Sequence, residues 1–372
     1  MTLSYPQVRW SCSLSVPDNI VMGDRLDEYR RKRDAKRTPE PVPSERPSPG
    51  ADNRFVIQQH HARALHWDLR LERDGVLVSW AVPRGLPRDQ VRNHLAVHTE
   101  DHPLEYLDFH GEIPAGEYGG GRMTVFDSGT YETEKWKPDE VMVTLHGSRV
   151  SGRYVLFRTA RPVPGKREDW MVRRMSPPPD GWVPIPDLVR PSRPTPVDAL
   201  PEPDADWAFE MRWDGTRAIA YVSGGRLRLT SISDQDVSGA YPPVRDLGAA
   251  LAPTEVVLDG EVIAFDKAGR IRAAPVTAPG RRPPPGLVIS YLVYDVLWLE
   301  GRSTLDLAYT ERRELLDGLA LSGPAWQTPP SFTGGGEFAL RAAHEQGLPG
   351  VVAKRLESAY TPGRRSPDWL KI

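Results

Sequence analysis

A proline-rich segment divides this chain into two parts and limits what each part can become. Residues 176–203 contain ten prolines in twenty-eight positions. Proline lacks a backbone N–H and fixes φ, so this segment cannot form a long helix or a central strand. We therefore predict a semi-rigid linker at residues 176–200. A chain of 372 residues also exceeds the usual size of one hydrophobic core. The predicted domains are residues 24–175 and 201–372, with residues 1–23 disordered.

Composition excludes several classes of protein. Apolar residues make up 39% and charged residues 26%, as in globular proteins, and no apolar run could span a membrane or serve as a secretion signal. The single cysteine, Cys12, excludes an internal disulfide framework and a cysteine-based zinc site. We expect an intracellular, cytoplasmic protein with no membrane partner. A net charge of −2 argues against a global basic field, so the basic run at residues 30–37 alone indicates only a solvated helix face.

The two parts differ in their periodicity. Residues 55–175 form short runs that alternate between apolar and polar positions, and Asp74-Gly75 is a hairpin signal between two of them. This pattern predicts an all-β barrel or sandwich, preceded by a short charged helix at residues 26–36 and an extended stretch at 38–50. In residues 201–372 strand-like and helix-like runs alternate, which predicts an α+β domain.

Histidine placement directs attention to the first domain, because eight of the nine histidines lie between His60 and His146. In the strand predicted at residues 65–71, His66, Asp68 and Arg70 share one face because side chains two apart point the same way. His60 is near enough in sequence to supply a third ligand. Two imidazoles and a carboxylate suit manganese, iron or zinc with open positions, and Arg70 could grip a phosphate or carboxylate. The alternative is a set of unrelated surface histidines beside a salt bridge.

A second cluster contains His94, His98 and His102, followed by Tyr106. His102 could act as a general acid or stabilise a transferring phosphoryl group, although a structural histidine at a strand end has the same spacing. The glycine-rich run at residues 116–121 lacks the Gly-Lys-Ser/Thr ending of a phosphate loop. We predict that Gly119 to Gly121 form a tight turn.

The motifs "FVIQQHHARALHWDLRLERDGVLVSWAVPRG", "EDHPLEY" and "GEIPAGEYGGG" resemble the 3′-phosphoesterase module of bacterial DNA ligase D over about residues 24–175. The resemblance implies a β-barrel, Mn²⁺ or another divalent metal as cofactor, and His60, His66 and Asp68 as its ligands. Other positions matching functional residues of the family are Arg70, His102, Tyr106, Arg33, Asp34 and Glu40. One position departs from the family pattern: His94 replaces the arginine usual before "LAV", which would weaken phosphate binding or shift its pH dependence.

The second domain resembles the nucleotidyltransferase fold of ATP-dependent DNA ligases, through "FEMRWDGTRA", "LDGEVIAF", "YLVYDVLWLEG", "GVVAKR" and "DWLKI". The positions that match the ligase site are Arg212, Asp214, Gly215, Arg217, Glu261, Lys354 and Lys371. Arg212 stands where a ligase has its nucleophilic lysine, and a guanidinium offers no lone pair to attack ATP. Pro349 and Ile232 replace a glutamate and an arginine. With no C-terminal OB domain expected, we predict an inactive pseudo-ligase that does not use ATP, with residual nucleotide binding as the alternative.

The resemblance to the 3′-phosphoesterase module implies an enzyme that removes a 3′-terminal ribonucleoside and then the remaining 3′-phosphate from DNA during double-strand break repair. By resemblance its partners would be DNA ends, a Ku-like end-binding protein and a separately encoded ligase or polymerase, near a bacterial nucleoid. Three other hypotheses stay open at this stage: a non-haem iron oxygenase, a non-catalytic scaffold for DNA ends, and an active ligase. The additional cationic side chains suited to a phosphate argue against the oxygenase. The complete set of candidate metal ligands argues against the scaffold, and Arg212 argues against the active ligase.

Overall fold

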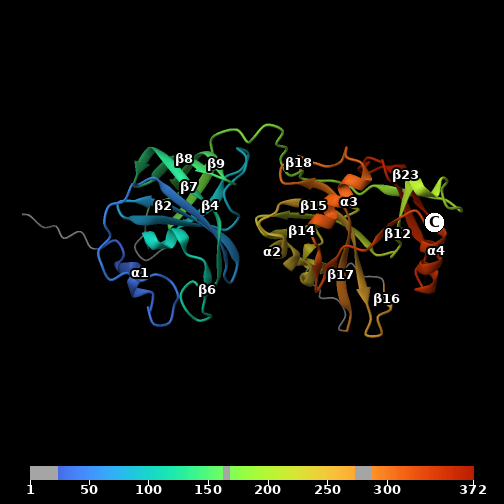
Figure 1. Cartoon of the computed structure of the whole chain (residues 1–372), viewed down its shortest axis with the longest axis horizontal. Coiled ribbons are helices and arrows are strands. Elements are labelled where there is room, and N and C mark those ends of the chain that lie inside the picture. Colours follow the sequence, from blue (N-terminus) through green and yellow to red (C-terminus); the bar gives the residue numbers. More distant parts are fainter. Residues whose placement is uncertain (1–23, 162–167, 273–285) are drawn as a thin grey trace, which may run out of the picture.

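The computed structural model describes residues 24–161, 168–272 and 286–372, which form two lobes joined by one connection (Figure 1). The disorder predicted for residues 1–23 lies outside the described residues. Within the described part of the chain, no helix is long and apolar enough to cross a membrane.

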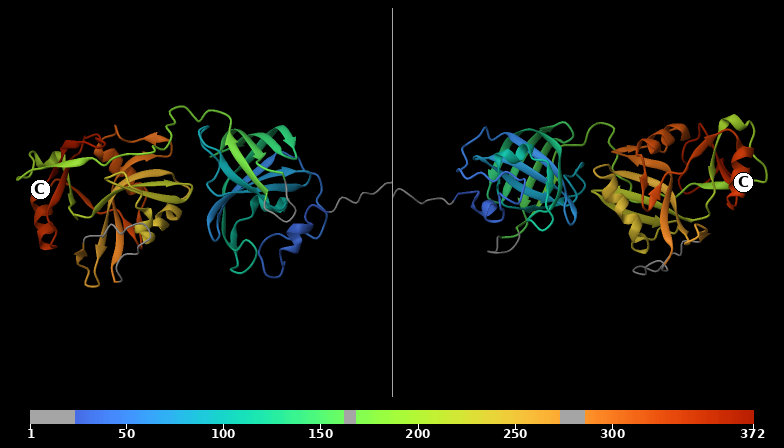
Figure 2. Two further views of the ribbon diagram at one scale, coloured as in Figure 1. Left: turned by 180° about the vertical axis from the view of Figure 1, so that it is seen from behind. Right: turned by 60° about the horizontal axis from the view of Figure 1, so that its bottom comes forward.

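The first lobe is a closed antiparallel barrel, as the alternation predicted (Figure 2). Among the described residues eight strands form the ring, and β7 closes it by pairing with β1. In ring order the strands are β1 (Arg54–His61), β2 (Leu65–Arg73), β3 (Val76–Val82), β4 (His94–His98), β10 (Glu168–Arg174), β9 (Ser151–Arg158), β8 (Glu140–Gly147) and β7 (Gly121–Lys137).

The hairpin between β2 and β3 turns at Asp74 and Gly75, as predicted. Their φ values are +52° and +81°, and two positive φ angles in sequence are the geometry of the tight turn that suits twisted strands. A Cβ at residue 75 would also lie 2.5 Å from the backbone oxygen of Ser48, so glycine is needed on two counts.

Alternation along the strands separates the two faces of the barrel wall. The inner face carries a large apolar cluster that includes Trp67, Leu69 and Trp80. The outer face of β1–β3 is covered by residues 24–50 and 99–113, whose apolar side chains Tyr29, Tyr106 and others form a second cluster. The elements of this cover are α1 (Asp27–Arg31), β5 (His102–Pro103), a 3₁₀ turn (Leu104–Asp108) and β6 (Gly111–Ile113). The helix predicted over residues 26–36 is therefore shorter than expected.

The second lobe contains two sheets, as expected for an α+β domain. The smaller sheet has the order β11 (Arg193–Pro196), β23 (Arg365–Lys371), β22 (Val351–Arg355), β12 (Trp207–Met211) and β21 (Ser331–Thr333). The larger has the order β14 (Arg226–Ser231), β13 (Thr216–Ser223), β15 (Val256–Phe265), β17 (Val288–Leu299), β20 (Trp326–Gln327) and β19 (Ser322–Gly323), with β16 (Ile271–Arg272) on β15 and β18 (Arg302–Ser303) on β17. The helices are α2 (Leu247–Leu251), α3 (Tyr309–Gly318) and α4 (Gly336–Glu345), and 3₁₀ turns lie at Asp204–Asp206, Ser238–Ala240 and Pro242–Asp246.

The proline-rich segment connects the lobes, but its second half does not behave as a free linker. The N–H of Val183 donates to the oxygen of Gly301 at 2.7 Å, and the N–H of Val189 donates to the Tyr221 hydroxyl at 2.6 Å. Further along, β11 pairs in parallel with β23. Prolines are tolerated here because β11 lies at the edge of its sheet. Residues 183–197 are thus part of the second domain.

Candidate metal centre and basic pocket

The outer face of β1 and β2 holds a compact set of three side chains of the types that ligate metals. His66 and Asp68 point to this face by alternation, and His60 on β1 lies directly opposite His66 in the strand register. One ligand atom from each of the three residues lies within 4.8 Å of the other two. His60 and Asp68 are buried and His66 is partly exposed, so the set is reachable from solvent on the His66 side.

In each imidazole a hydrogen bond uses the ring nitrogen that points away from Asp68, which leaves the nitrogen facing Asp68 free for a metal. Nε2 of His60 donates to the oxygen of Gly119 at 2.8 Å, and Nδ1 of His66 donates to the oxygen of Ala64 at 3.0 Å. The remaining nitrogens, Nδ1 of His60 and Nε2 of His66, lie 3.7 and 3.6 Å from the Asp68 carboxylate. Metal-bound histidines normally donate their other N–H to a carbonyl in this way, so the residues present fit a divalent metal. Gly119, predicted only as a turn, therefore also orients His60.

Arg70 lies beside this set and is almost fully buried. Its guanidinium donates to Gln58 at 2.7 Å, to Ser79 at 3.0 Å and to the Asp68 carboxylate at 3.0 Å. Burial alone would raise the pKa of Asp68, but the positive charge of the adjacent Arg70 outweighs it, and the pKa is about 2. The carboxylate is therefore ionised at neutral pH, as a metal ligand must be.

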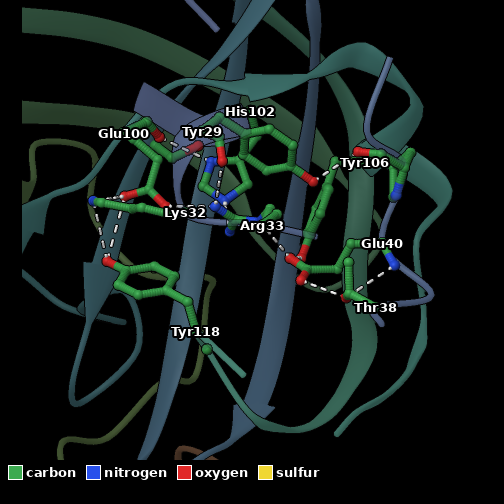
Figure 3. Close-up of polar contacts among 12 residues, drawn as sticks. Tyr29, Lys32, Arg33, Thr38, Glu40, Glu100, His102, Tyr106 and Tyr118 are labelled. Carbon is green, nitrogen blue, oxygen red and sulfur yellow. Dashed lines mark hydrogen bonds and ion pairs between the residues drawn. The ribbon is translucent and has the colours of Figure 1, made fainter. Parts of the chain in front are cut away.

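A network of charged and aromatic groups joins the N-terminal segment to the barrel (Figure 3). Arg70 borders this network, because its guanidinium lies 4.7 Å from the centre of the Tyr106 ring. The guanidinium of Arg33 donates to Glu40 at 2.9 Å and to Glu100 at 2.9 Å, and it stacks 3.8 Å from the centre of the Tyr29 ring. The Tyr106 hydroxyl donates to the same Glu40 at 2.7 Å. Buried charges need partners of opposite charge, so this network holds Arg33 in one position despite its burial.

His102 is buried in the centre of the network (Figure 3). Its Nδ1–H donates to the oxygen of Glu100 at 2.8 Å, and its Nε2 accepts from Arg33 at 3.4 Å. Burial, together with the charges of Arg70 and Arg33, holds the pKa of His102 well below its usual value. The ring is thus neutral in the free protein and cannot release a proton until a negatively charged group arrives beside it.

Sequence reasoning missed several members of this network. The Glu100 carboxylate accepts hydrogen bonds from Lys32 at 3.0 Å and from Arg33. The Tyr118 hydroxyl lies 3.4 Å from the Lys32 ammonium and 3.5 Å from the Glu100 carboxylate (Figure 3). Arg33 and Glu100 are 67 residues apart in sequence, so no local spacing could pair them. The only available signal was the position of Glu100 in "EDHPLEY".

Two predicted site residues lie elsewhere. Asp34 is exposed, and its carboxylate accepts the backbone N–H of Lys36 at 3.0 Å, which stabilises a turn. His94 is on the same side of β4 as Ala96, which packs inside the barrel, and its Nδ1 bonds to the oxygen of Gly85 at 2.7 Å. Burial lowers its pKa. The structure therefore does not place these two side chains with the metal set, and their predicted roles at the site remain predictions.

The predicted ligase-site residues gather around a pocket of about 530 Å³ in the second domain. Lining it are Arg212, Asp214, Arg217, Glu261, Lys354 and Lys371, together with Ile232. The N–H of Gly215 donates to Glu261 at 3.1 Å. Arg212 donates two hydrogen bonds to the Asp214 carboxylate, both 2.7 Å long. The side chain at the position that matches the ligase nucleophile is therefore paired with a neighbouring carboxylate. Pro349 is exposed, just before β22.

Ion pairs hold the walls of this pocket in place. Nζ of Lys354 lies 2.9 Å from the Glu210 carboxylate and 4.3 Å from the centre of the Trp369 ring. Arg217 pairs with Asp259 at 2.6 Å. Glu210 and Asp259 were not recognised from the sequence because they occupy strand positions that read as ordinary buried sites.

Comparison with known proteins gives two domain matches. The DNA Ligase D 3′-phosphoesterase domain matches residues 58–158, and the ATP dependent DNA ligase domain matches residues 191–372. The multifunctional non-homologous end joining protein LigD of Mycolicibacterium smegmatis is 44% identical over 361 residues, which cover 94% of this chain and 46% of the relative. The corresponding protein of Pseudomonas aeruginosa is 32% identical over 408 residues, covering 93% of this chain and 47% of the relative.

Among solved structures, one titled mycobacterial DNA ligase D complexed with ATP and MES is 35% identical, with a TM-score of 0.44, covering 49% of this chain and 59% of the other. The present chain spans about half the length of the curated relatives that it matches. The chain therefore belongs to the DNA ligase D family, as a 3′-phosphoesterase domain followed by an ATP-dependent DNA ligase domain.

Proposed function

We propose that the barrel is a manganese-dependent phosphoesterase acting on DNA 3′ ends during double-strand break repair. It would remove a 3′-terminal ribonucleoside and then the remaining 3′-phosphate, leaving a 3′-hydroxyl. The observation that carries the proposal is the set His60, His66 and Asp68, whose free ligand atoms converge within 4.8 Å beside the buried cation Arg70. Two imidazole nitrogens and one carboxylate are a suitable donor set for Mn²⁺ with positions left for substrate.

The metal would be held by Nδ1 of His60, Nε2 of His66 and the Asp68 carboxylate. When bound, it would supply Lewis-acid polarisation of a phosphoryl oxygen. Arg70 has five N–H donors, and three hydrogen bonds fix its plane, so donor capacity remains for a phosphate oxygen. A guanidinium held in position before substrate arrives stabilises developing negative charge without reorganisation.

His102 would change its protonation as the phosphate binds. It is neutral in the free protein, and a phosphate beside it would favour the charged imidazolium. The proton would be held at Nε2, the atom that now accepts from Arg33, because Nδ1 is bonded to the oxygen of Glu100. This order of events revises the simple general-acid role: proton uptake must come first, and the leaving oxygen could then receive that proton.

For the second domain we propose a pseudo-ligase. Arg212 stays protonated, and its Nε and one terminal nitrogen both donate to the Asp214 carboxylate, so it cannot attack the α-phosphate of ATP. The pocket keeps a volume of about 530 Å³, which favours the alternative that the domain binds a nucleotide without forming a covalent adenylate. A Ku-like end-binding protein and a separately encoded ligase or polymerase are the partners this division of labour would need.

The test uses the purified chain and a primer-template whose primer ends in one ribonucleotide or in a 3′-phosphate. We expect conversion of both to a 3′-hydroxyl with Mn²⁺, and none in EDTA. His60→Ala, His66→Ala and Asp68→Ala should each abolish conversion, whereas His146→Ala, which removes an exposed histidine of the same barrel, should not. Tight DNA-end binding without conversion would instead identify a non-catalytic scaffold, and iron-dependent oxidation would identify an oxygenase.

A further inference from the structure

A second cleft, of about 490 Å³, lies where the two domains meet. Its walls come from one end of the barrel, from the linker and from two loops of the second domain near Gly224 and Pro253. None of the three candidate metal ligands lines it, and the lining residue Trp67 projects from the inner face of β2, opposite to Asp68. The cleft is therefore separate from the phosphoesterase site.

Positive charge predominates in this cleft. Four arginines and two glutamates line it, and Arg88 alone pairs with both glutamates, Glu255 at 3.7 Å and Glu300. Arg84 and Arg149 are exposed and have no carboxylate partner within the described residues. The excess charge is therefore free to attract an anion from solution.

Arg174 adds a buried positive charge to the same wall. Its guanidinium donates only to neutral oxygens, the nearest being the Tyr154 hydroxyl at 2.7 Å and the backbone oxygen of Ser151 at 2.8 Å. Within the described part of the chain it has no carboxylate within ion-pair distance. A buried cation without a counter-ion is costly, and an anion that enters the cleft would offset part of that cost.

Aromatic side chains supply the rest of the lining. Trp67, Phe126, Tyr154 and Trp182 all border the cleft, and the Arg149 guanidinium lies 5.1 Å from the centre of the Phe126 ring. The indole N–H of Trp182 is buried and has no hydrogen-bond partner among the described residues. Aromatic rings beside unpaired arginines are the surroundings that proteins offer to a base and its phosphate.

We propose that this inter-domain cleft binds one nucleotide of a single DNA strand, with the phosphate at Arg84 and Arg149 and the base against the aromatic wall. The volume lies in the usual range of small-ligand pockets, about 300–1,000 Å³, so it admits a nucleotide but not a duplex. A strand seated here would contact both domains and hold a DNA end near the barrel. A free nucleotide has the same chemistry, and the test separates the two sources.

The test measures the binding of a fluorescein-labelled single strand of about ten thymidines with a 3′-hydroxyl end, in EDTA, by anisotropy over a range of salt concentrations. The variant is Arg84→Ala/Arg149→Ala in the full chain. Both side chains are exposed, so the fold should persist, as circular dichroism can verify. The matched control is Arg341→Ala, which removes an exposed arginine on α4 of the second domain.

We expect the double variant to bind the strand several-fold more weakly and to lower the slope of log affinity against log salt by about 0.7, the contribution of one phosphate contact on a single strand. The control should match the natural chain. Unchanged affinity and slope in the double variant would overturn the proposal. If thymidine monophosphate competes with the strand at equal nucleotide concentration, the ligand is a free nucleotide.

A second readout locates the strand. With 5-bromouracil in the strand, irradiation should cross-link the DNA to peptides that contain Trp182 or Tyr154, and the Arg84→Ala/Arg149→Ala variant should lose that cross-link. Cross-links confined to peptides of α1 and of the 3₁₀ turn Leu104–Asp108, which do not line the cleft, would place the strand elsewhere and contradict the proposal. Turnover of a 3′-phosphate at saturating DNA should be the same in the double variant and the natural chain, so failure of the phosphoesterase proposal remains distinguishable from failure of this one.

Discussion

Replacement of Asp68 by asparagine separates two roles that we propose for this carboxylate, the stabilisation of the barrel through Arg70 and the binding of a metal. The side chain keeps its size but loses its charge, and Arg70 stays buried beside it. The pKa of Asp68 is about 2, against 3.8 for an ordinary aspartate, a difference equivalent to about 2.5 kcal/mol in favour of the ionised form. We expect Asp68→Asn to destabilise the metal-free barrel by about 2–3 kcal/mol at pH 7.

The pH dependence of this loss has a definite sign. Because the pKa of Asp68 is lower in the folded state, its stabilisation is fully present above pH 3.8 and disappears as the pH falls through about 2. The difference between the natural chain and Asp68→Asn should therefore be constant from pH 7 to about pH 4.5 and shrink below pH 3.8. Since the chain has two domains, the assay is amide hydrogen exchange of β1 and β2 in urea rather than one global melting curve.

Addition of Mn²⁺ then tests the second role. At about a hundredfold excess over the dissociation constant, binding should stabilise the natural barrel by about 2.7 kcal/mol and leave Asp68→Asn unchanged. The matched control is Asp127→Asn: Asp127 is another buried carboxylate of the barrel, and it accepts the backbone N–H groups of Arg149 and Val150. This control should lose stability yet keep the full Mn²⁺ effect. Equal stabilisation of Asp68→Asn by the metal would refute its place among the ligands.

Three further predictions concern other groups. Burial opposes ionisation of Glu100, but Arg33 and Lys32 lower its pKa below 4.5. Glu100→Gln should therefore destabilise the barrel by about 1–3 kcal/mol at pH 7 and by progressively less below pH 4.5. An equal loss of stability at pH 3, measured by urea unfolding, would contradict this. Arg70→Lys should slow 3′-phosphate release about a hundredfold in single-turnover assays. The reason is that an ammonium group cannot form hydrogen bonds to Gln58, Ser79 and Asp68 in one plane, as the guanidinium does. An unchanged rate would assign Arg70 a structural role. After incubation with α-labelled ATP and Mg²⁺, neither the natural chain nor Arg212→Lys should acquire covalent label. In the variant, Pro349 and Ile232 still lack the carboxylate and the cation expected of a ligase. Label on the natural chain would overturn the pseudo-ligase proposal.

The barrel and its row of outward polar groups were predictable because they depend on local periodicity. The hairpin at Asp74-Gly75 and the shared face of His66, Asp68 and Arg70 follow from alternation within one hairpin. The pairing of His60 with His66 follows from the register of the two strands that the next short turn connects. These relations span few residues, so the sequence contains the information directly.

Relations between distant segments were not predictable in the same way. Arg33 meets Glu100 only because the N-terminal segment folds over the outer face of β3 and β5, and no spacing in the sequence encodes that cover. The inward direction of His94 depends on the register in which Ala81 faces Val97 across β3 and β4. The linker packs on the second domain through Val189 and β11, although its composition by itself predicts no stable contacts.

The intact walls of the second pocket do not by themselves argue for ligase chemistry. Lys354 with Glu210, and Arg217 with Asp259, are ion pairs whose carboxylates are buried, and removal of one partner of such a pair costs about 3–5 kcal/mol. Stability alone is therefore sufficient reason for these four residues to be present. Arg212 differs, since it pairs with the half-exposed Asp214, and an ion pair of that kind contributes at most about 1 kcal/mol. At the position that matches the ligase nucleophile the fold therefore does not require a particular cation, and the arginine found there supports the proposal of a pseudo-ligase.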